Sequence, residues 1–308
     1  MARCDLCHST AGEPYLDLPA PYQLWRCAVC GLVCLSPQPT AEELTRQYGQ
    51  AYYTSQAASG RLAPPWQERL KEAAYRSRCG YLAPSAPVAA RWRQEALRVA
   101  LGWRARRRLP VRQAGRLLDV GCGNGQQAAW LRDHVPGWEV EGVEVNAFAA
   151  RQAREGYGLT VHAGYLEQLN LPPDSYDMVS FWHSLEHTFS PQTTLRAAYT
   201  LLRPGGWLGI EVPNIESQEA RRAGSSWYHL AVPVHLYHFS PTTLVRLVEG
   251  CGFKLLRLEA VRGSVGQLSL VQQRASAESG PARMFTYWTA RTLGRFSAWG
   301  LRLYAERV

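Results

Sequence analysis

Four cysteines near the start of the chain have the spacing of a metal site. Cys4 and Cys7 form one C-x-x-C pair, Cys27 and Cys30 form a second, and 19 residues lie between the pairs. Each pair makes a tight turn that directs two thiolates at one point, and two such turns complete the tetrahedral shell of Zn²⁺. All four ligands come from the protein, so we expect a structural zinc. Unpaired thiols or a redox pair are the alternatives.

The other cysteines form no further pair of this kind. Cys34 follows the second pair by four residues and is a possible substitute ligand, whereas Cys79, Cys122 and Cys251 lie far apart. We expect these three to be packed as small apolar side chains. The cysteine-bearing segment of some 35 residues is too short to bury a core of its own. A bound metal would supply the missing folding energy.

A first histidine-bearing segment lies at 181–187. His183 and His187 are spaced i, i+4 for one helical turn, with Glu186 beside them. These residue types are able to bind a metal or supply a general base. The alternative is that they only orient a loop.

A second segment, Trp227–Ser240, carries three histidines among aromatic residues. Imidazoles in a water-poor pocket suit the deprotonation of a hydroxyl or another weak acid. His235 is the best single candidate for that base. The alternative is that the aromatic side chains form core and the imidazoles are hydrogen-bonded to the backbone.

The segment Arg116–Gly125 carries the strongest binding signal. An apolar strand runs into three alternating glycines and a helical stretch, 126–134, follows. Glycines let the backbone turn sharply and approach a ligand closely. The next strand ends at Glu144, where an acid is placed to accept both ribose hydroxyls of an adenosine. Gln126 stands where a dinucleotide fingerprint needs glycine, so the loop suits an adenosine without a pyrophosphate.

The elements that must position these residues alternate between strand and helix from Arg116 onward, which predicts an α/β fold with parallel strands. Thr40 is expected to cap a helix, with Glu43 completing a capping box, and Ser240 to cap another. Further elements are predicted as helices over 66–82, 88–108 and 283–299, and strands over 253–261 and 301–308. We expect three parts: a zinc-ribbon-like domain 1–38, a helical linker or cap 39–110, and an α/β domain 111–308 with substrate-covering insertions at about 214–240 and 262–299.

The net charge of +9 is concentrated in one segment. Residues 61–115 hold 13 Lys and Arg against 3 Asp and Glu, which suits an anionic lipid, a nucleotide or RNA, or else a solvated helix face. Within 1–35, Arg3 and Arg26 are outnumbered by three acids, so that segment is no nucleic-acid patch. The chain has no run of 18 apolar residues and no secretory signal at its start, so we expect a cytoplasmic protein.

Leu117–Gly125 resembles the first motif of the class I S-adenosylmethionine-dependent methyltransferases, and Glu144 resembles their second-strand acid. Residues 171–179 resemble the stretch before the fourth strand, and 201–206 resemble the loop before the fifth. The resemblance covers roughly residues 110–308. It implies a Rossmann-like seven-stranded sheet with helices on both faces, in which 253–261 and 301–308 form the last pair of strands.

The resemblance also implies roles for individual residues. Asp119 and the Gly121 backbone would hold the methionine part of the cofactor, Glu144 the ribose, and the turn 164–166 the adenine. Tyr165 is one departure, because the family often has Asp there; the Leu166 backbone can still serve. Many members also carry Glu-His at 186–187, where the pair often only orients the loop. The complete set of expected cofactor residues is Asp119, Gly121, Cys122, Gly123, Gly125, Glu144, Val145, Gly164, Tyr165, Leu166 and Trp182.

The cysteine-bearing segment and the proline linker after it resemble a bacterial subgroup found among sugar and natural-product methyltransferases. We therefore expect methyl transfer from S-adenosylmethionine to a small molecule, a glycan or a lipid-linked sugar, at a hydroxyl. The alternatives are an RNA methyltransferase that grips phosphates with 61–115, C-methylation of a sugar, and a binding protein without chemistry. The helix predicted over 283–299 interleaves aromatic residues with arginines, which suits peripheral contact with the inner membrane face, or packing against the 88–108 helix or a second subunit.

Overall fold

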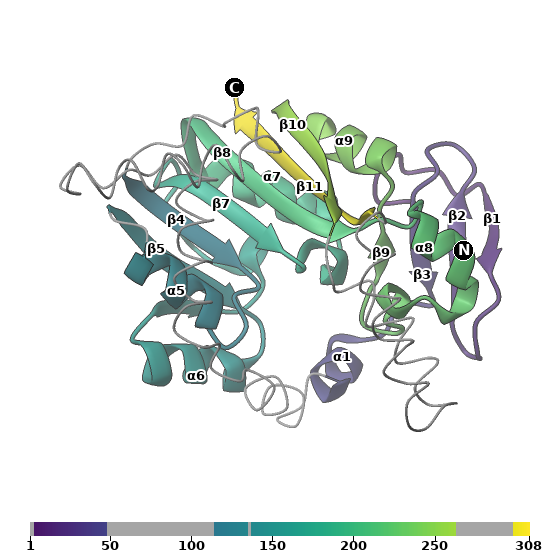
Figure 1. Ribbon diagram of the computed structural model, residues 1–308, viewed down its shortest axis with the longest axis horizontal. Helices are drawn as coiled ribbons and strands as arrows, with labels where there is room; N and C mark the ends of the chain where they lie inside the picture. The colour runs from purple at the N-terminus through teal and green to yellow at the C-terminus, as the bar shows by residue number, and fades with distance from the viewer. Residues whose placement is uncertain (1–2, 48–113, 135–136, 263–297) are drawn as a thin grey trace, which may run out of the picture. The chain divides into compact units, whose positions relative to one another are not determined.

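The computed structural model describes residues 3–47, 114–134, 137–262 and 298–308 (Figure 1). They divide between two compact units, one made of 1–47 with 164–308 and the other of 48–163. The helices predicted over 66–82 and 88–108, nearly all of the basic segment 61–115, Cys79, and all but the last two residues of the helix predicted over 283–299 lie outside the described residues. No described helix is both long enough and apolar enough to cross a membrane.

The elements in chain order are β1 (Gly12–Leu16), β2 (Gln23–Cys27), β3 (Val33–Ser36), α1 (Ala41–Gln47), β4 (Gly115–Val120), α5 (Gln126–His134), β5 (Trp138–Glu144), α6 (Ala147–Tyr157), β6 (Thr160–Ala163), η1 (Leu166–Gln168), β7 (Tyr176–Trp182), η2 (Leu185–His187), α7 (Pro191–Leu201), β8 (Leu202–Pro213), α8 (Gln218–Ala223), η3 (Gly224–Ser226), η4 (Tyr228–Leu230), β9 (Tyr237–His238), α9 (Pro241–Gly250), β10 (Phe253–Arg262) and β11 (Ala298–Arg307).

A seven-stranded sheet runs in the order β10-β11-β8-β7-β4-β5-β6, which confirms the predicted Rossmann-like fold. Within the units, β4, β5 and β6 pair in parallel, as do β7 and β8. The last two strands pair antiparallel, from Phe253 opposite Arg307 to Arg262 opposite Ala298. Because β11 begins at Ala298, the helix predicted over 283–299 was extended two residues too far; Trp299 is a buried strand residue.

In the unit that holds β4–β6, small side chains bring helix and sheet together. Ala149, Ala150 and Ala153 of α6 are fully buried, as is Leu118 of β4. The Asn146 side chain caps the start of α6, and a left-handed glycine ends it. The predicted strand–loop–helix order is therefore present, with α5 beginning at the expected residue.

In the other unit, β7 and β8 form an apolar core of side chains with no exposure, among them Val179, Phe181 and Leu208. Of the loop expected over 201–206, Leu201 ends α7 and residues 202–206 belong to strand β8. The register jumps there, from Tyr176 opposite Leu202 to Met178 opposite Trp207, so the intervening residues form a bulge.

The cysteine-bearing segment forms an antiparallel sheet of β1, β2 and β3, and β9 joins it as the fourth strand (Figure 1). Val33 lies opposite His238, and Cys34 opposite Tyr237. The helix expected after Thr40 is α1, and its capping box is present: the Thr40 amide donates to Glu43 at 2.8 Å, and the Glu43 amide donates to the Thr40 hydroxyl at 3.2 Å. The Ser240 cap on α9 is confirmed as well.

Candidate functional site

The glycine-rich loop between β4 and α5 turns through three glycines with positive φ, at 121, 123 and 125. Only glycine adopts such angles without strain. A Cβ on Gly125 would also lie 2.6 Å from the Cβ of Ala153 and 2.7 Å from a methyl group of Leu159. This glycine therefore allows the loop to pack directly against α6 and the segment after it.

Glu144 ends β5 beside this loop with its carboxylate almost fully buried. One oxygen accepts the Gly123 amide at 2.8 Å, and the other accepts the Asn146 amide at 2.8 Å. Burial raises the pKa of Glu144, although these backbone donors oppose the shift. Each oxygen has a second lone pair, so the group can still accept two hydroxyls.

The neighbouring residues fit an adenosyl cofactor. Val145 follows the acid and is 49% exposed, so it is accessible at the end of β5. Asp119 is buried one strand away, opposite Gly142, and Cys122 packs over that same glycine. The Gly121 amide donates to the Val143 carbonyl at 2.8 Å, so its N–H is already committed within the protein.

The remaining expected cofactor residues lie in the unit that holds β7. Gly164 has a φ of 138°, and Tyr165 precedes η1 with its ring 5.8 Å from that of Phe189. Leu166 is buried, and Trp182 ends β7.

The turn after β7 differs from the helical turn expected over 183–187. His183 has a φ of 55°, and only Leu185–His187 form a short 3-10 turn, η2. His183 Nδ1 lies 3.5 Å from Glu186 Oε1, and its Nε2 lies 3.4 Å from Glu211 Oε1. Burial opposes its protonation, but the two carboxylates outweigh burial and raise the pKa of His183 to about 9. His183 is therefore an imidazolium at neutral pH, which makes it a hydrogen-bond donor and a poor base.

A compact cluster forms between η2 and the second histidine-bearing segment. One ligand atom from each of Glu186, His187 and His235 lies within 4.8 Å of the others. The rings of His187 and His235 meet edge to face at 4.6 Å between centroids. Burial opposes the ionisation of Glu186, yet the neighbouring His183 holds its pKa at about 2. His183, which the sequence grouped with Glu186 and His187, lies outside the three-residue cluster, and His235 takes its place.

His235 is buried, and burial lowers its pKa well below the usual value, so the imidazole stays neutral. Burial likewise lowers the pKa of His229 and of His238 to about 4. Trp227, Tyr237 and other aromatic side chains of this segment are buried as core. Buried aromatic side chains and the 2.8 Å contact of His235 Nδ1 with the His229 carbonyl oxygen match the alternative of an aromatic core with imidazoles bonded to the backbone. The role of His235 as a base stays a prediction.

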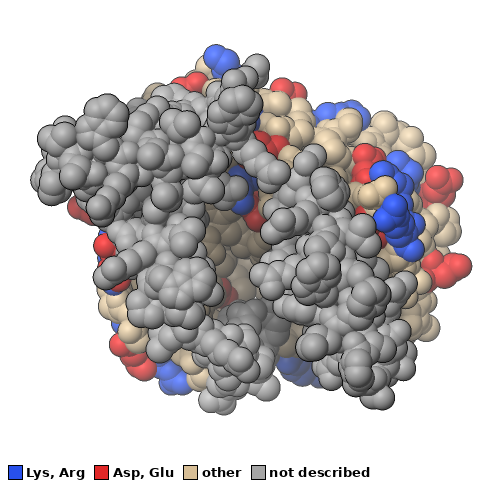
Figure 2. All heavy atoms as spheres, in the orientation of Figure 1, with Lys and Arg blue, Asp and Glu red and all other residues tan. Residues whose placement is uncertain are grey.

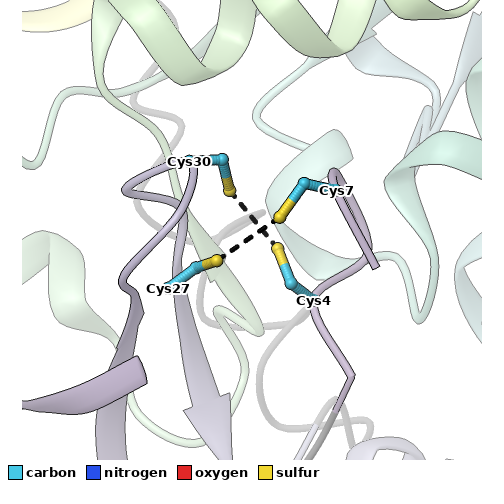
Figure 3. A group of neighbouring side chains, drawn as sticks. All are labelled: Cys4, Cys7, Cys27 and Cys30. Atoms are coloured by element: carbon cyan, nitrogen blue, oxygen red, sulfur yellow. Dashed lines mark hydrogen bonds between the residues drawn. The ribbon is translucent and has the colours of Figure 1, made fainter. Parts of the chain in front are cut away.

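The four N-terminal cysteines converge on one point (Figure 3). Cys4 and Cys30 sulfurs lie 3.4 Å apart, as do those of Cys7 and Cys27, which is far longer than a disulfide bond. Four thiolates around Zn²⁺ at about 2.3 Å would stand about 3.8 Å from one another. The cluster needs only a small expansion to fit that ion. Cys34 is buried outside the cluster, and Cys122 and Cys251 are packed as expected.

The cysteine-bearing sheet is hydrogen-bonded to the histidine cluster through Leu236. The Leu35 amide donates to the Leu236 carbonyl at 2.9 Å, and the Leu236 amide donates to the Glu186 carbonyl at 2.8 Å. Asp5 adds a second link, because its carboxylate accepts the Ser190 hydroxyl at 2.7 Å and the Gln192 amide at 2.9 Å at the start of α7.

Three residues around His183 were missed in the sequence. Glu211 accepts a hydrogen bond of 2.6 Å from Arg302, and Trp299 stacks on the His183 ring at 5.3 Å. An acid inside the apolar strand segment 207–213 was a usable signal for Glu211. No local pattern pointed to Arg302, because the β8–β11 register joins residues 91 positions apart.

A family model described as a methyltransferase domain matches residues 89–258, more than half of the chain. The chain is 26% identical over 156 residues to a ubiquinone biosynthesis O-methyltransferase of Burkholderia pseudomallei, covering 47% of this chain and 67% of that protein. A protein with the same description from Aeromonas salmonicida is 28% identical over 156 residues, covering 47% of this chain and 66% of that protein.

Among solved structures, the complex that contains the Haloferax volcanii Trm112 methyltransferase activator matches with a TM-score of 0.50 and 17% identity, covering 65% of this chain and 85% of the matched chain. An S-adenosylmethionine-dependent methyltransferase from Mesorhizobium loti matches with a TM-score of 0.45 and 21% identity, covering 63% of this chain and 91% of that chain.

The sheet, the glycine loop and the buried acid that ends β5 are those of a Rossmann-like α/β protein. The chain belongs to the methyltransferase-domain family, and it is an S-adenosylmethionine-dependent methyltransferase.

Proposed function

We propose that this enzyme methylates a hydroxyl of a small molecule or glycan. The observation that carries the proposal is the cluster of Glu186, His187 and His235, which puts a neutral buried imidazole next to a carboxylate. The O-methyltransferase descriptions of the relatives from Burkholderia and Aeromonas support oxygen as the acceptor atom.

S-adenosylmethionine supplies an activated methyl group on a sulfonium. The protein therefore has to bind the cofactor, orient the acceptor and remove the proton from the acceptor hydroxyl. Asp119, the glycine loop and Glu144 bind the cofactor in this proposal. The acceptor hydroxyl loses its proton at the cluster, and turnover depends on His235, whose neutral ring is able to accept a proton. The His183 ring faces Glu186 and Glu211 with its two nitrogens, so its role in this proposal is to hold these two carboxylates in place.

We also propose that the four clustered cysteines hold a structural Zn²⁺. All four thiols are free and lie together, and closed four-cysteine sites have no position left for a substrate. Burial raises the pKa of the Cys4 and Cys30 thiols, whereas hydrogen bonds of Cys27 to backbone amides and to Cys7 outweigh its burial and lower its pKa to about 7. The proposal therefore rests on the convergence of the four sulfurs, and a bound cation would stabilise all four thiolates. The zinc would hold the sheet that supports β9 and, through it, His235 and His238.

RNA is the second candidate acceptor, on the strength of the basic segment 61–115. That segment lies almost wholly outside the described residues. Among the described side chains on the face drawn in Figure 2, acidic and basic groups stand side by side without a broad basic area. The small-molecule proposal is preferred because the relatives from Burkholderia and Aeromonas are described as O-methyltransferases of ubiquinone biosynthesis.

The experiment is a transfer assay with methyl-labelled S-adenosylmethionine and a cell extract, separated afterwards into small-molecule, lipid-linked, RNA and protein fractions. The proposal predicts label in the small-molecule or lipid-linked fraction, lost in His235→Ala. Label found chiefly in RNA and removed by ribonuclease would instead support the second candidate.

A further inference from the structure

We infer that Glu186, His187 and His235 form a second metal site, which binds a divalent cation of the zinc type. Two imidazoles and one carboxylate are the protein ligands of open zinc sites, and the same set suits Fe²⁺. The cysteine cluster contributes none of these atoms. The two sites therefore differ in ligand chemistry, sulfur in one and nitrogen with oxygen in the other.

The first argument is the unsatisfied carboxylate. The Glu186 side chain is 1% exposed, and neither of its oxygens has a hydrogen-bond partner among the described residues. His183 Nδ1, at 3.5 Å, is the nearest cationic group, and that distance is beyond a normal N–H···O bond. The His183 imidazolium compensates the charge of this buried carboxylate only in part, and a coordinated cation would bind its oxygens directly.

The second argument is the orientation of both imidazoles. His235 Nδ1 lies 2.8 Å from the His229 carbonyl oxygen, and His187 Nδ1 lies 2.9 Å from the Val234 carbonyl oxygen. A carbonyl only accepts, so each Nδ1 carries the proton and Nε2 is the ring nitrogen that can bind a cation. Metal-binding histidines are held in this way, with one ring nitrogen donating to a backbone carbonyl and the other facing the metal.

The distances between the three ligand atoms are also close to those of a metal site. Ligand atoms around a tetrahedral ion with bonds of about 2.0–2.1 Å stand about 3.4 Å apart. One ligand atom from each of the three residues lies within 4.8 Å of the others. Small side-chain rotations that move these atoms by about 1 Å would bring them to the spacing that the ion requires. His187 is the partly exposed member, which leaves a coordination position accessible to water or to an acceptor oxygen.

The role of this site rests on the proposed function. An oxygen bound to such a cation becomes more acidic, so the cation would promote deprotonation of the acceptor hydroxyl. His235 would then act as a ligand and not as a free base. The binding of the cation itself does not depend on that role.

The test is a zinc count on desalted protein expressed with excess zinc, followed by Co²⁺ substitution. We expect two equivalents of zinc in the wild type and one in both His235→Gln and Glu186→Gln. His238→Gln is the matched control, since His238 is buried with its ring centroid 6.2 Å from that of His235 yet lies outside the cluster. It should keep two equivalents.

Cobalt distinguishes the two sites and reports on folding. Co²⁺ bound to thiolates gives an intense charge-transfer absorption, which a site of nitrogen and oxygen ligands lacks. His235→Gln and Glu186→Gln should keep that absorption, showing an intact cysteine site, while the weaker bands of the second site disappear. One equivalent in the wild type, or two in both cluster variants, would overturn the inference.

The assay also separates this inference from the proposed function. Loss of hydroxyl methylation in His235→Gln together with a single zinc in the wild type refutes the second metal and retains His235 as a free base. A second zinc in an enzyme that labels only RNA supports the metal site and refutes the proposed acceptor.

Discussion

Replacing Asp5 tests whether the cysteine-bearing sheet is energetically coupled to the body of the enzyme. Its carboxylate accepts two hydrogen bonds, 2.7 Å from the Ser190 hydroxyl and 2.9 Å from the Gln192 amide. Hydrogen bonds to a charged group each contribute about 1.5–3 kcal/mol, and an acid at a helix start adds about 0.3–1 kcal/mol. Ser190 still bonds to Thr193, which offsets part of the loss. We therefore expect Asp5→Ala to lower the free energy of unfolding by about 2–4 kcal/mol.

Urea denaturation of the zinc-loaded protein, followed by circular dichroism, measures this loss. Asp17→Ala is the control, because Asp17 is an exposed acid of the same segment and its removal changes the net charge equally. We expect that variant to stay within about 0.5 kcal/mol of the wild type. Equal midpoints for the two variants would refute the coupling between the cysteine-bearing segment and α7.

Glu144→Gln should weaken S-adenosylmethionine binding by about 1–3 kcal/mol in calorimetry. Burial raises the pKa of Glu144 above the ordinary 4.5 of a glutamate, so acidification should protonate this carboxylate at a higher pH than usual. The cofactor affinity of the wild type should fall over that pH range. The pH dependence should be absent in Glu144→Gln. In thermal denaturation, Gly125→Ala should lower the free energy of unfolding by about 2–4 kcal/mol, because the added methyl group is crowded and the backbone has a positive φ. Gly156→Ala places its methyl group in open space on α6 and should raise the free energy of unfolding by about 0.5–1 kcal/mol. Cys27→Ser should lose the cysteine-bound zinc and reduce turnover with cofactor affinity kept. Unchanged turnover in a variant without that zinc would argue against support of the histidine cluster by the cysteine site.

Local signals were sufficient for the sheet and for the glycine loop. Leu117–Gly125 combines an apolar strand with three glycines, and the structure has a strand, a positive-φ loop and a helix there. Thr40 was recognisable as a cap because Glu43 follows three residues later, and Ser240 because it directly precedes a proline at a helix start. The cysteine cluster was equally accessible, since each C-x-x-C pair fixes its own turn.

Contacts between residues far apart in the chain could not be predicted from local sequence patterns. β9 is only two residues long, and its pairing with β3 joins residues about 200 positions apart. The i, i+4 spacing of His183 and His187 suggested a shared helical face, but the positive φ of His183 turns it towards Glu211 and leaves His187 to meet His235. Such a turn depends on tertiary packing, which no short pattern reports.

We propose that cofactor binding depends on Glu144 and the glycine loop, and that acceptor activation depends on the separate cluster of Glu186, His187 and His235. The most direct test measures the affinity for S-adenosylmethionine and the rate of methyl transfer on the same preparations of the wild type, Glu144→Gln and His235→Gln. The account predicts that His235→Gln keeps wild-type cofactor affinity and loses turnover by about 10²–10⁴-fold, while Glu144→Gln loses affinity. Wild-type turnover in His235→Gln would contradict it.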